Sequence, residues 1–458
     1  MIPMRLDEIA AVVGGEVHGD PAVLVTGHAF VDSRSPVDGG LYVAIVGERV
    51  DGHEYAGGAH AVLGSRPTDA PTVVVADPVV ALGLLARHVV DRTRAVVLAL
   101  TGSQGKTGTK DYLASVLTHL AGTDKVVATT GNGNNEIGVP LTVLRAGAGT
   151  DYLVVEMGAR GIGHIAYLCG IAPPRIAAAL NVGTAHVGEF GGREQIALAK
   201  GEIVEVLPAD GTAVLNADDP LVAAMAGRTT ARVLTFGRGG SVRWDAMDLD
   251  ELGRPSFTIA VDHEAHPVRL LQTGAHQTQN ATAAAAMAVA AGFPLADVAA
   301  ALSSATAASR WRMELHERPD GMLVVNDAYN ANPDSVRAAL EALVAIGRAR
   351  GRRTVAVLGQ MMELGSEHEA GHRSVGADAV RLGVDVVVVV GEPAAPIADA
   401  IEDASQDAGV PAVIRTEGRG EALAWVRQNA GPEDVVLVKA SRGAALEWVA
   451  EQLVGRPR

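Results

Sequence analysis

Short apolar runs alternate with longer amphipathic stretches along most of this chain. In its middle part the runs are "AVVLAL", "DYLVVEM", "IAAALNV" and "GTAVLNA", at residues 95–100, 151–157, 176–182 and 211–217. Runs that are apolar throughout are typical of strands buried on both faces of a parallel sheet. The pattern therefore predicts a central α/β domain built on a parallel sheet.

The pattern changes between Arg232 and Leu271, where alternating strands are separated by Gly and Pro turns. Alternation of this kind is typical of antiparallel strands with one solvated face. We interpret the segment as an antiparallel appendage of the central domain.

The two ends of the chain show related patterns. Near the C-terminus the runs "GMLVVNDA", "RTVAVLG", "VDVVVVVG" and "PEDVVLVKA" alternate with helical stretches, which predicts a doubly wound, Rossmann-like domain. The N-terminal part mixes "LYVAIV" and "APTVVVA" with Gly-rich turns and closes on a helix near Val79–Asp91. We expect three α/β domains: a small mixed α/β domain at 1–93, a central domain at 94–309 and the Rossmann-like domain at 310–458.

Composition narrows the classes of partner. The 458 residues are 48% hydrophobic with a net charge of −15, and no basic run is present. This balance argues against nucleic acid or an anionic membrane as the main partner. The single cysteine, Cys169, excludes a disulfide framework and fits a reducing cytosol. The N-terminus lacks the charge and apolar core of a signal peptide, and the Ala-rich stretch near residue 285 is interrupted by Gly292 and Pro294, so we expect a cytoplasmic protein without membrane insertion.

One glycine-rich turn joins the first central strand to a helix. It consists of Gly102, Ser103, Gln104, Gly105, Lys106 and Thr107. The backbone N–H groups of such a turn and the helix N-terminus behind it favour anions, the lysine adds a charge, and the threonine offers a hydroxyl to Mg²⁺. The strict pattern would place Gly where Leu100 stands, so the loop is the shorter variant TGxxGKT. We interpret it as a phosphate-binding loop (P-loop); the alternative is a tight turn with an incidental lysine.

A P-loop needs an acidic residue for its metal ion. Glu156 ends the strand "DYLVVE", where a Walker-B carboxylate belongs. An acid at a strand end is by itself more often a turn residue, but its pairing with the loop upstream favours the metal role. By spacing alone, His186 in "NVGTAHVGEFGG" is an ordinary loop histidine, and Lys200, inside the predicted helix "EQIALAKGEIVEVL", is a solvated lysine.

Two further polar clusters stand out. His276 and Asn280 lie four residues apart on one face of a helix start, where the amide could read a base edge or could serve in ordinary capping. After the strand "GMLVVN", the string "DAYNANPDS" holds more hydrogen-bonding side chains than capping requires. They are Asp327, Tyr329, Asn330, Asn332 and Ser335. Pro333 and Asp334, in contrast, are residues typical of the first turn of a helix.

Taken in order and approximate spacing, these motifs resemble the Mur ligases. The matching strings are "TGSQGKT", "TTGNGNNEIGVP", "EMGA", "NVGTAHVGEFGG", "AKGEI", "GAHQTQNA", "NDAYNANPDS" and "VLGQMMELG". The resemblance runs from about residue 30 to residue 443 and is greatest to the members that add D-alanyl-D-alanine to UDP-N-acetylmuramoyl-tripeptide. The pair "NDAYNANPDS" and "GNGNNEIGVP" discriminates most, since the P-loop alone indicates only a nucleotide.

The resemblance implies an ATP-dependent, amide-forming ligase of peptidoglycan synthesis. Its three domains would bind the UDP substrate, bind ATP and close over the site. ATP would phosphorylate the terminal carboxylate of the tripeptide, and the amine of D-alanyl-D-alanine would attack the acyl phosphate. The implied cofactors are ATP and Mg²⁺, the implied partners are the two substrates, and we expect a monomer.

The family pattern also implies roles for individual residues. Thr107 and Glu156 would hold one Mg²⁺, and His186 a second. Lys200 matches the family's carbamylated lysine, which replaces the solvated-lysine interpretation by analogy. Asn280 matches the adenine-contacting asparagine, with His276 nearby.

Other implied roles belong to the outer domains. Arg312, at the second domain boundary, would reach the phosphates when the C-terminal domain closes, and Asp327 would approach from the same domain. The implied substrate-facing residues are Ser33 and Arg34 in "VDSRS", Asn132, Asn134 and Asn135 in "GNGNNE", and Tyr329, Asn330 and Asn332.

Three positions depart from the family pattern. Gln104 stands where Asn or Ser is usual, which should matter little because the loop acts through its backbone. Trp311 replaces a small residue and could shift the hinge, and Ala440 replaces a Gly, which leaves the roles of Lys439, Ser441 and Arg442 open.

The alternatives are sister ligases and proteins of other classes. A sister ligase for a diamino acid should carry a distinct motif in the third domain, which is absent from the sequence, and a folylpolyglutamate synthetase should lack the "DSR…DGH" block at the N-terminus. A GTPase-like switch should carry the guanine reader N-K-x-D, whereas the nearest string is "LNADDP". A structural P-loop scaffold would not need the "AYNANPDS" loop.

Overall fold

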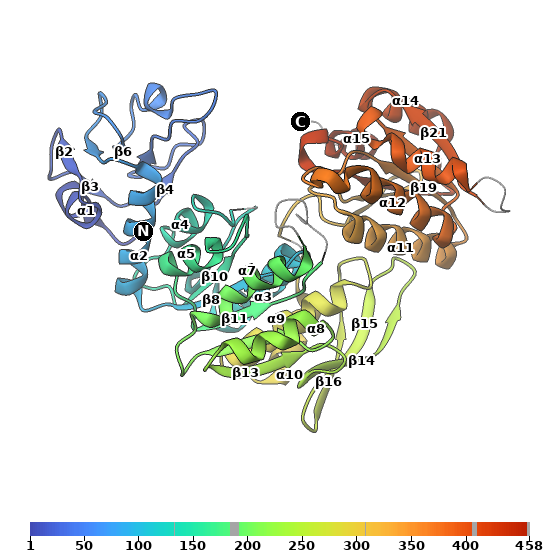
Figure 1. Ribbon diagram of the computed structural model, residues 1–458, viewed down its shortest axis with the longest axis horizontal. Helices are drawn as coiled ribbons and strands as arrows, with labels where there is room; N and C mark the ends of the chain where they lie inside the picture. Colours follow the sequence, from blue (N-terminus) through green and yellow to red (C-terminus); the bar gives the residue numbers. More distant parts are fainter. Residues whose placement is uncertain (132, 184–191, 307, 405–409, 456–458) are drawn as a thin grey trace.

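The computed structural model describes residues 1–131, 133–183, 192–306, 308–404 and 410–455. The chain forms three main sheets in sequence order, with the N-terminal and C-terminal parts at opposite sides of a central part (Figure 1). Within the described residues, no helix has the length and apolarity needed to cross a membrane.

The N-terminal part is a small mixed sheet flanked by helices. Its strand order is β2-β7-β6-β5-β4, with β2 antiparallel to β7 and the other pairs parallel. The strands are β2 (Glu16–His18), β4 (Ala29–Phe30), β5 (Leu41–Val43), β6 (Ala61–Gly64) and β7 (Thr72–Val74), and β1 (Met4–Arg5) pairs separately with β3 (Leu24–Val25). The helices are α1 (Leu6–Val13), the short 3₁₀ turn η1 (Gly52–Tyr55) and α2 (Pro78–Thr93), which confirms the helix expected near Val79–Asp91.

The central part is a nine-stranded sheet of order β16-β15-β14-β13-β12-β11-β8-β10-β9. Its strands are β8 (Val96–Thr101), β9 (Val126–Ala128), β10 (Tyr152–Glu156), β11 (Ile176–Ala179), β12 (Thr212–Asn216), β13 (Arg232–Phe236), β14 (Val242–Leu249), β15 (Pro255–Val261) and β16 (Glu264–Arg269). Its helices are α3 (Lys106–Ala121), α4 (Gly138–Val143), α5 (His164–Ile171), α7 (Arg193–Glu205), α8 (Pro220–Ala223), α9 (Gln277–Ala290) and α10 (Leu295–Ser304), with 3₁₀ turns η2 (Thr123–Lys125) and η3 (Ala224–Arg228).

Both faces of the central sheet are buried at β8, β10, β11 and β12, as the continuous apolar runs predict. In β8, Val97 and Ala99 belong to one core cluster, and Leu98 and Leu100 belong to another on the opposite face. Because successive side chains of a strand point to opposite faces, each face needs its own layer of helices.

The antiparallel appendage is present but starts later than the sequence predicts. The prediction of antiparallel pairing from Arg232 is wrong for β13, which pairs in parallel with β12 along its whole length. Antiparallel pairing begins with β14 against β15 and continues from β15 to β16. Two adjacent residues at the start of β13, Arg232 and Val233, are exposed, although the strand keeps the parallel direction of its neighbour β12.

The C-terminal part is a six-stranded sheet of order β17-β18-β22-β19-β20-β21. Only β17 is antiparallel to its neighbour. The strands are β17 (Glu314–Glu317), β18 (Leu323–Asn326), β19 (Arg353–Leu358), β20 (Val386–Val390), β21 (Ala412–Thr416) and β22 (Asp434–Lys439). The helices are α11 (Pro333–Arg350), α12 (His368–Leu382), α13 (Ala395–Asp403), α14 (Arg419–Asn429) and α15 (Glu447–Val454), with 3₁₀ turns η4 (Gly365–Glu367), η5 (Glu392–Ala394) and η6 (Arg442–Ala444).

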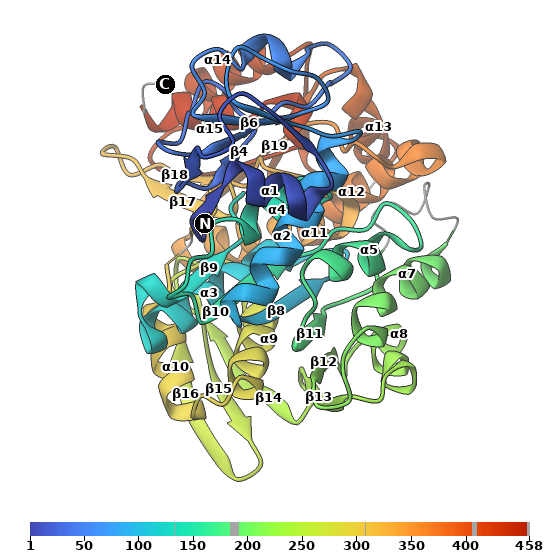
Figure 2. The same cartoon turned by 90° about the vertical axis from the view of Figure 1, so that its left-hand side faces the viewer.

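Helix α2 joins the N-terminal part to the central part. Figures 1 and 2 show it between the two sheets. Its buried residues Leu82 and Leu85 belong to one apolar cluster with Leu41 of the N-terminal sheet and Ile165 of α5. A shared core of this kind favours a fixed placement of the two parts, in contrast to the C-terminal part, which has its own clusters.

Candidate active site

The P-loop lies where β8 meets α3. Gly105 has φ +77° and precedes the first helical residue, Lys106. A side chain is excluded there for two reasons: the conformation is left-handed, and a Cβ would lie 2.5 Å from Oδ1 of Asn280. The same carboxamide faces Gly108, whose Cβ would lie 2.8 Å from Nδ2 of Asn280. Asn280 of α9 is therefore packed against the P-loop helix, beside the nucleotide site that the sequence predicts.

Asn181, which follows β11, braces the loop. Its Oδ1 accepts the backbone N–H groups of Ser103 and Gln104, each at 3.0 Å, and its Nδ2 donates 3.0 Å to the carbonyl of Gln104. The Ser103 hydroxyl accepts the N–H of Gly183 at 2.9 Å. Sequence reasoning missed Asn181, although its place directly after a parallel strand, at the edge that carries ligands in such sheets, was a usable signal.

Lys106 is folded back onto its own loop. Its Nζ donates 2.7 Å to the carbonyl of Gly102. Burial lowers the pKa of Lys106, Arg312 lowers it further, and the carboxylates of Glu156 and Glu363 oppose the shift. The ammonium therefore lies in a pocket where charges from the central and C-terminal parts meet.

Glu156 is buried at the end of β10, as predicted, and its two oxygens have separate partners. Oε2 accepts the hydroxyl of Thr107 at 2.9 Å, and Oε1 accepts Nδ2 of Asn134 at 2.8 Å. The structure thus brings together a hydroxyl from the start of α3, a carboxylate from the end of β10 and an amide from the segment before α4. These are oxygen-rich groups of the kind that Mg²⁺ prefers.

Lys200 is buried on α7, and the expectation from spacing of a solvated lysine is therefore wrong. Burial lowers the pKa of Lys200 well below its usual value, and the nearby ammonium of Lys106 lowers it further. The sequence could not show this, because polar and apolar residues are not separated onto two faces of α7. The pattern therefore does not tell which side of the helix points inward. Two lysines thus face the same region as Glu156.

His276 is half-buried at the N-cap position of α9. Its Nδ1 has no hydrogen-bond partner among the described residues. Burial lowers the pKa of His276, with Asp327 opposing the shift and Lys439 adding to it. Its charged neighbours therefore belong to the C-terminal part, whereas Asn280 donates 3.0 Å to Oε1 of Gln277 on its own helix.

Arg312 reaches the P-loop region from the second boundary. It acts electrostatically on Lys106, and its guanidinium lies 4.3 Å from the ring centroid of Tyr329. Its Nε has no hydrogen-bond partner among the described residues. Asp334, interpreted from sequence as a helix-start residue, approaches the loop after β11. A Cβ on Gly183 would lie 3.0 Å from Oδ2 of Asp334. The C-terminal part is thus closed onto the P-loop side of the central part.

The remaining predicted residues of the C-terminal part are tied into local structure. Oδ2 of Asp327 accepts Nζ of Lys439 at 2.5 Å, and Oδ1 accepts the N–H of Met313 at 3.1 Å. The carbonyl of Asn330 also accepts Nζ of Lys439, at 3.0 Å. Asn332 caps α11 through a reciprocal pair of hydrogen bonds with Ser335.

Other predicted residues lie away from the P-loop or have capping roles. Arg34 is exposed after β4 and pairs with Asp32 at 2.8 Å, and Ser33 lies between them. Oδ1 of Asn135 accepts two N–H groups at the start of α4. Asn132 and His186 lie outside the described residues. Within those residues, no three His, Cys, Asp or Glu side chains gather as a metal cluster.

Comparison with known proteins decides the family. The chain matches the Mur ligase middle domain over residues 100–288 and the Mur ligase glutamate ligase domain over residues 311–442. It is 45% identical to the UDP-N-acetylmuramoyl-tripeptide–D-alanyl-D-alanine ligase of Mycobacterium bovis, over 99% of this chain and 98% of that protein.

The chain belongs to the Mur ligase family. Solved structures agree with this: MurF from Acinetobacter baumannii superposes with a TM-score of 0.87 at 32% identity, over 99% of both chains. MurF ligase from Thermotoga maritima in complex with ADP superposes with a TM-score of 0.79 at 30% identity, over 94% of this chain and 98% of that one.

Membership confirms the fold class and the resemblance predicted from the motifs. A Mur ligase is an ATP-dependent ligase, so the GTPase-like switch and the purely structural scaffold are both excluded as classes. The nucleotide site of a Mur ligase is also consistent with the geometry of the glycine turn described above.

Proposed function

We propose that this chain joins D-alanyl-D-alanine to UDP-N-acetylmuramoyl-tripeptide with hydrolysis of ATP, in peptidoglycan synthesis. The observation that carries the proposal is the full-length identity of 45% to a ligase named for that reaction. Two sister ligases of known structure are below 20% identical to this chain, which indicates a shared fold alone.

The reaction has two steps. A carboxylate oxygen of the tripeptide attacks the γ-phosphorus of ATP, ADP leaves, and an acyl phosphate forms. The amine of D-alanyl-D-alanine then attacks the carbonyl carbon, and inorganic phosphate leaves with that carboxylate oxygen while the amine loses a proton. Since two anions must meet in the first step, catalysis depends on positive charge placed at the γ-phosphate.

Lys106 and Arg312 are the cations that we assign to this task. Lys106 is held at the loop by a contact to Gly102 that bound phosphate would replace, and Arg312 has an unpartnered Nε close to it. The N–H groups of Gly105 and Lys106 would bind phosphate oxygens, since those of Ser103 and Gln104 are engaged by Asn181.

Asn280, packed on Gly105 and Gly108, would contact the adenine side of the nucleotide, with His276 behind it. Asp327 supports that side indirectly, because its carboxylate is already bound by Lys439 and by the backbone of Met313.

The residues present fit a magnesium site. Thr107 and Glu156 form a buried hydroxyl–carboxylate pair at 2.9 Å that would hold one ion, and His186 and Lys200 would contribute to a second. Bound Mg²⁺ neutralises phosphate charge as it transfers.

We propose that Lys200 is carbamylated. Only a neutral amine reacts with carbon dioxide, and burial beside Lys106 favours the neutral form. Carbamylation would replace the repulsion between two ammonium groups by attraction between an anion and a cation.

The residues that we assign to substrate binding would lie on both sides of this centre. Asn134, bound to Glu156, would face the muramoyl-peptide, together with Asn132 and Asn135 of the same sequence motif. The UDP group would bind at Ser33 and Arg34; the Arg34 side chain is 87% exposed and would exchange its contact with Asp32 for one with a diphosphate. Tyr329, Asn330 and Asn332 would line the side of the incoming amine.

We further propose domain borders at 93/94 and 309/310, with the three parts binding UDP, ATP and the incoming amine. The enzyme would act in the cytoplasm, where ATP is available and where Cys169 would stay a free thiol.

Phosphate release tests the proposal. The purified chain with ATP, Mg²⁺ and UDP-N-acetylmuramoyl-tripeptide should release phosphate with D-alanyl-D-alanine and not with D-alanine, L-alanine or a diamino acid. A Lys106→Ala variant should release none at an unchanged melting temperature. Equal release with a single amino acid would overturn the proposed substrate.

A further inference from the structure

A buried ion pair follows the P-loop on α3. Lys110 and Asp111 are 3% and 8% exposed, and the ammonium of Lys110 contacts Oδ1 of Asp111. They lie about one turn after Lys106, within ~7.5 Å along the helix. Burying two charges is unfavourable unless further hydrogen bonds complete the pair, so the partners of Asp111 indicate what the pair does.

Those partners belong to Ser309, which lies 198 residues further along the chain. Its backbone N–H donates 3.1 Å to Oδ2 of Asp111, and its hydroxyl donates 3.1 Å to Oδ1. Nζ of Lys110 donates 3.3 Å to the same hydroxyl. The last residue of the central part is therefore bound to the P-loop helix by three hydrogen bonds.

A second carboxylate holds the chain just beyond. The N–H of Met313 donates 3.1 Å to Oδ1 of Asp327, which belongs to the C-terminal part. Only Arg310, Trp311 and Arg312 lie between the two anchored residues. Any rotation of the C-terminal part relative to α3 must be absorbed by the backbone of this segment, which we call the hinge (310–312).

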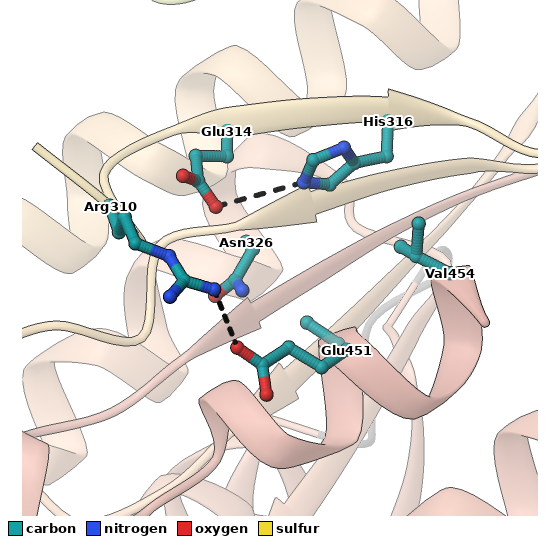
Figure 3. Close-up of a pocket in the computed structure, with 7 residues that line it drawn as sticks. Arg310, Glu314, His316, Asn326, Glu451 and Val454 are labelled. Atoms are coloured by element: carbon teal, nitrogen blue, oxygen red, sulfur yellow. Dashed lines mark hydrogen bonds and ion pairs between the residues drawn. The ribbon is translucent and has the colours of Figure 1, made fainter. Parts of the chain in front are cut away.

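Side-chain contacts bind the hinge to the C-terminal part. Trp311 has φ +58°, a conformation that a bulky residue rarely adopts. Its Nε1 donates 3.0 Å to Glu451, its ring stacks on Tyr329 at 6.4 Å, and the guanidinium of Arg442 lies 4.2 Å from the ring centroid. Figure 3 shows Arg310 reaching the same Glu451, at 3.3 Å. The hinge thus moves with the C-terminal part and pivots at Ser309.

We propose that Asp111, supported by Lys110, is a positioning residue for the ligase reaction: it fixes the pivot at Ser309 and thereby sets where Arg312 meets the phosphates. The inference rests on the proposed function, since it takes ATP as the ligand that Arg312 approaches. Asp111 touches no substrate in this account. It acts through a hinge of three residues.

The test separates loss of the pivot from damage to α3. In the double variant Lys110→Met/Asp111→Leu, both charges are replaced by apolar groups of similar size, so no charge is left buried alone. We expect kcat to fall at least about tenfold, because a displacement of about 1 Å has effects of that size or larger. ADP affinity, measured by calorimetry, should change less than twofold, since the P-loop itself is intact.

Two single substitutions sharpen the test. Ser309→Ala removes one of the two bonds to Asp111 and should lower kcat by a smaller factor, whereas Ser309→Thr keeps the hydroxyl and should retain wild-type kcat. Glu251→Gln is the matched control: it breaks another ion pair between the central and C-terminal parts, Arg350–Glu251 at 2.8 Å, and should leave kcat unchanged.

Three results would overturn the inference: wild-type kcat in the double variant, ADP affinity that falls in proportion to kcat, or Ser309→Ala equal to wild type. If the double variant fails to fold, the Ser309 pair decides alone. If the wild-type enzyme releases no phosphate, the proposed function fails and not the pivot. The pivot can then be tested by small-angle scattering, which compares the ADP-induced compaction of wild type and Ser309→Ala. Equal compaction of the two proteins would contradict the pivot.

Discussion

Beside the P-loop, the buried side chains of Lys200 and Glu156 and the half-buried side chain of Lys106 bring together more cations than anions. Each lysine has a lowered pKa, mainly because of burial, and Lys106 is a further cause of the shift at Lys200. Burial of like charges is unfavourable, so the arrangement is suited to a state in which phosphate and a carbamate are bound.

Substitution of Lys200 tests the carbamate. Lys200→Ala should lower phosphate release by at least about a hundredfold, because a preorganised charge at the transferring group is lost. Formate or acetate should restore part of the activity by replacing the carbamate in the space left. Lys125→Ala, at a partly exposed lysine, should behave as wild type. Full activity of Lys200→Ala without added acid would remove Lys200 from the site.

Cys169 gives a prediction for pH. Burial raises the pKa of its thiol from 9.0 to about 12, and Glu202 adds to the shift. Between these values the folded state binds more protons than the unfolded state, so the contribution of this group to stability falls as pH rises from 9 toward 12. Iodoacetamide at pH 9 should leave the native thiol unmodified and alkylate it in urea. Equal alkylation rates in both conditions would contradict the burial.

The positions of site residues were predictable from sequence where a motif fixes their neighbours. Lys106, Thr107 and Glu156 converge as expected, because parallel strands end at one edge of the sheet. The environment of Lys200 was not predictable without the family resemblance, since burial depends on how α7 packs. Asn332, which was counted from sequence among the substrate-facing residues, caps α11 in the structure.

Helix α7 is held by an arginine that lies outside the helix. Arg228 of η3 donates to the carbonyls of Ala197 and Leu198, at 2.9 and 2.8 Å, and to Glu205 at 2.8 Å. Its guanidinium lies where a Cβ on Gly201 would be, 1.8 Å from Nη1. The glycine after Lys200 therefore makes room for the arginine that fixes the helix.

Gly201→Ala should displace Arg228 from these carbonyls. Loss of hydrogen bonds worth about 1 kcal/mol each outweighs the helix preference of alanine, also about 1 kcal/mol, so we expect a net destabilisation of about 1–2 kcal/mol in urea unfolding. Gly170→Ala on α5 has open space around its Cβ and should be neutral or more stable by up to about 1 kcal/mol. Equal stability of the two variants would show that Arg228 does not hold α7.

Element types followed from the apolar runs more reliably than element pairing. The runs at β8, β10, β11 and β12 are strands of one parallel sheet, as predicted. The start of antiparallel pairing was predicted wrongly because β13, with its two exposed residues, resembles a half-solvated strand. Partner choice depends on long-range packing, which local alternation does not encode.

The three parts of the molecule are joined in two different ways. The N-terminal part shares an apolar core with the central part through α2. The C-terminal part has its own core and meets the central part through a smaller apolar contact at Leu252 and through polar contacts such as Arg350–Glu251. The placement of Arg312 near Lys106 therefore depends on the hinge and on domain closure, which sequence patterns cannot specify.

The central claim is that the P-loop site uses ATP to activate a carboxylate as an acyl phosphate. Oxygen-18 in the terminal carboxylate of UDP-N-acetylmuramoyl-tripeptide tests it most directly, because that oxygen leaves with phosphate only if the anhydride forms. Mass spectrometry of the phosphate released with D-alanyl-D-alanine should find one labelled oxygen per molecule. Unlabelled phosphate, released at the rate of product formation, would contradict the account.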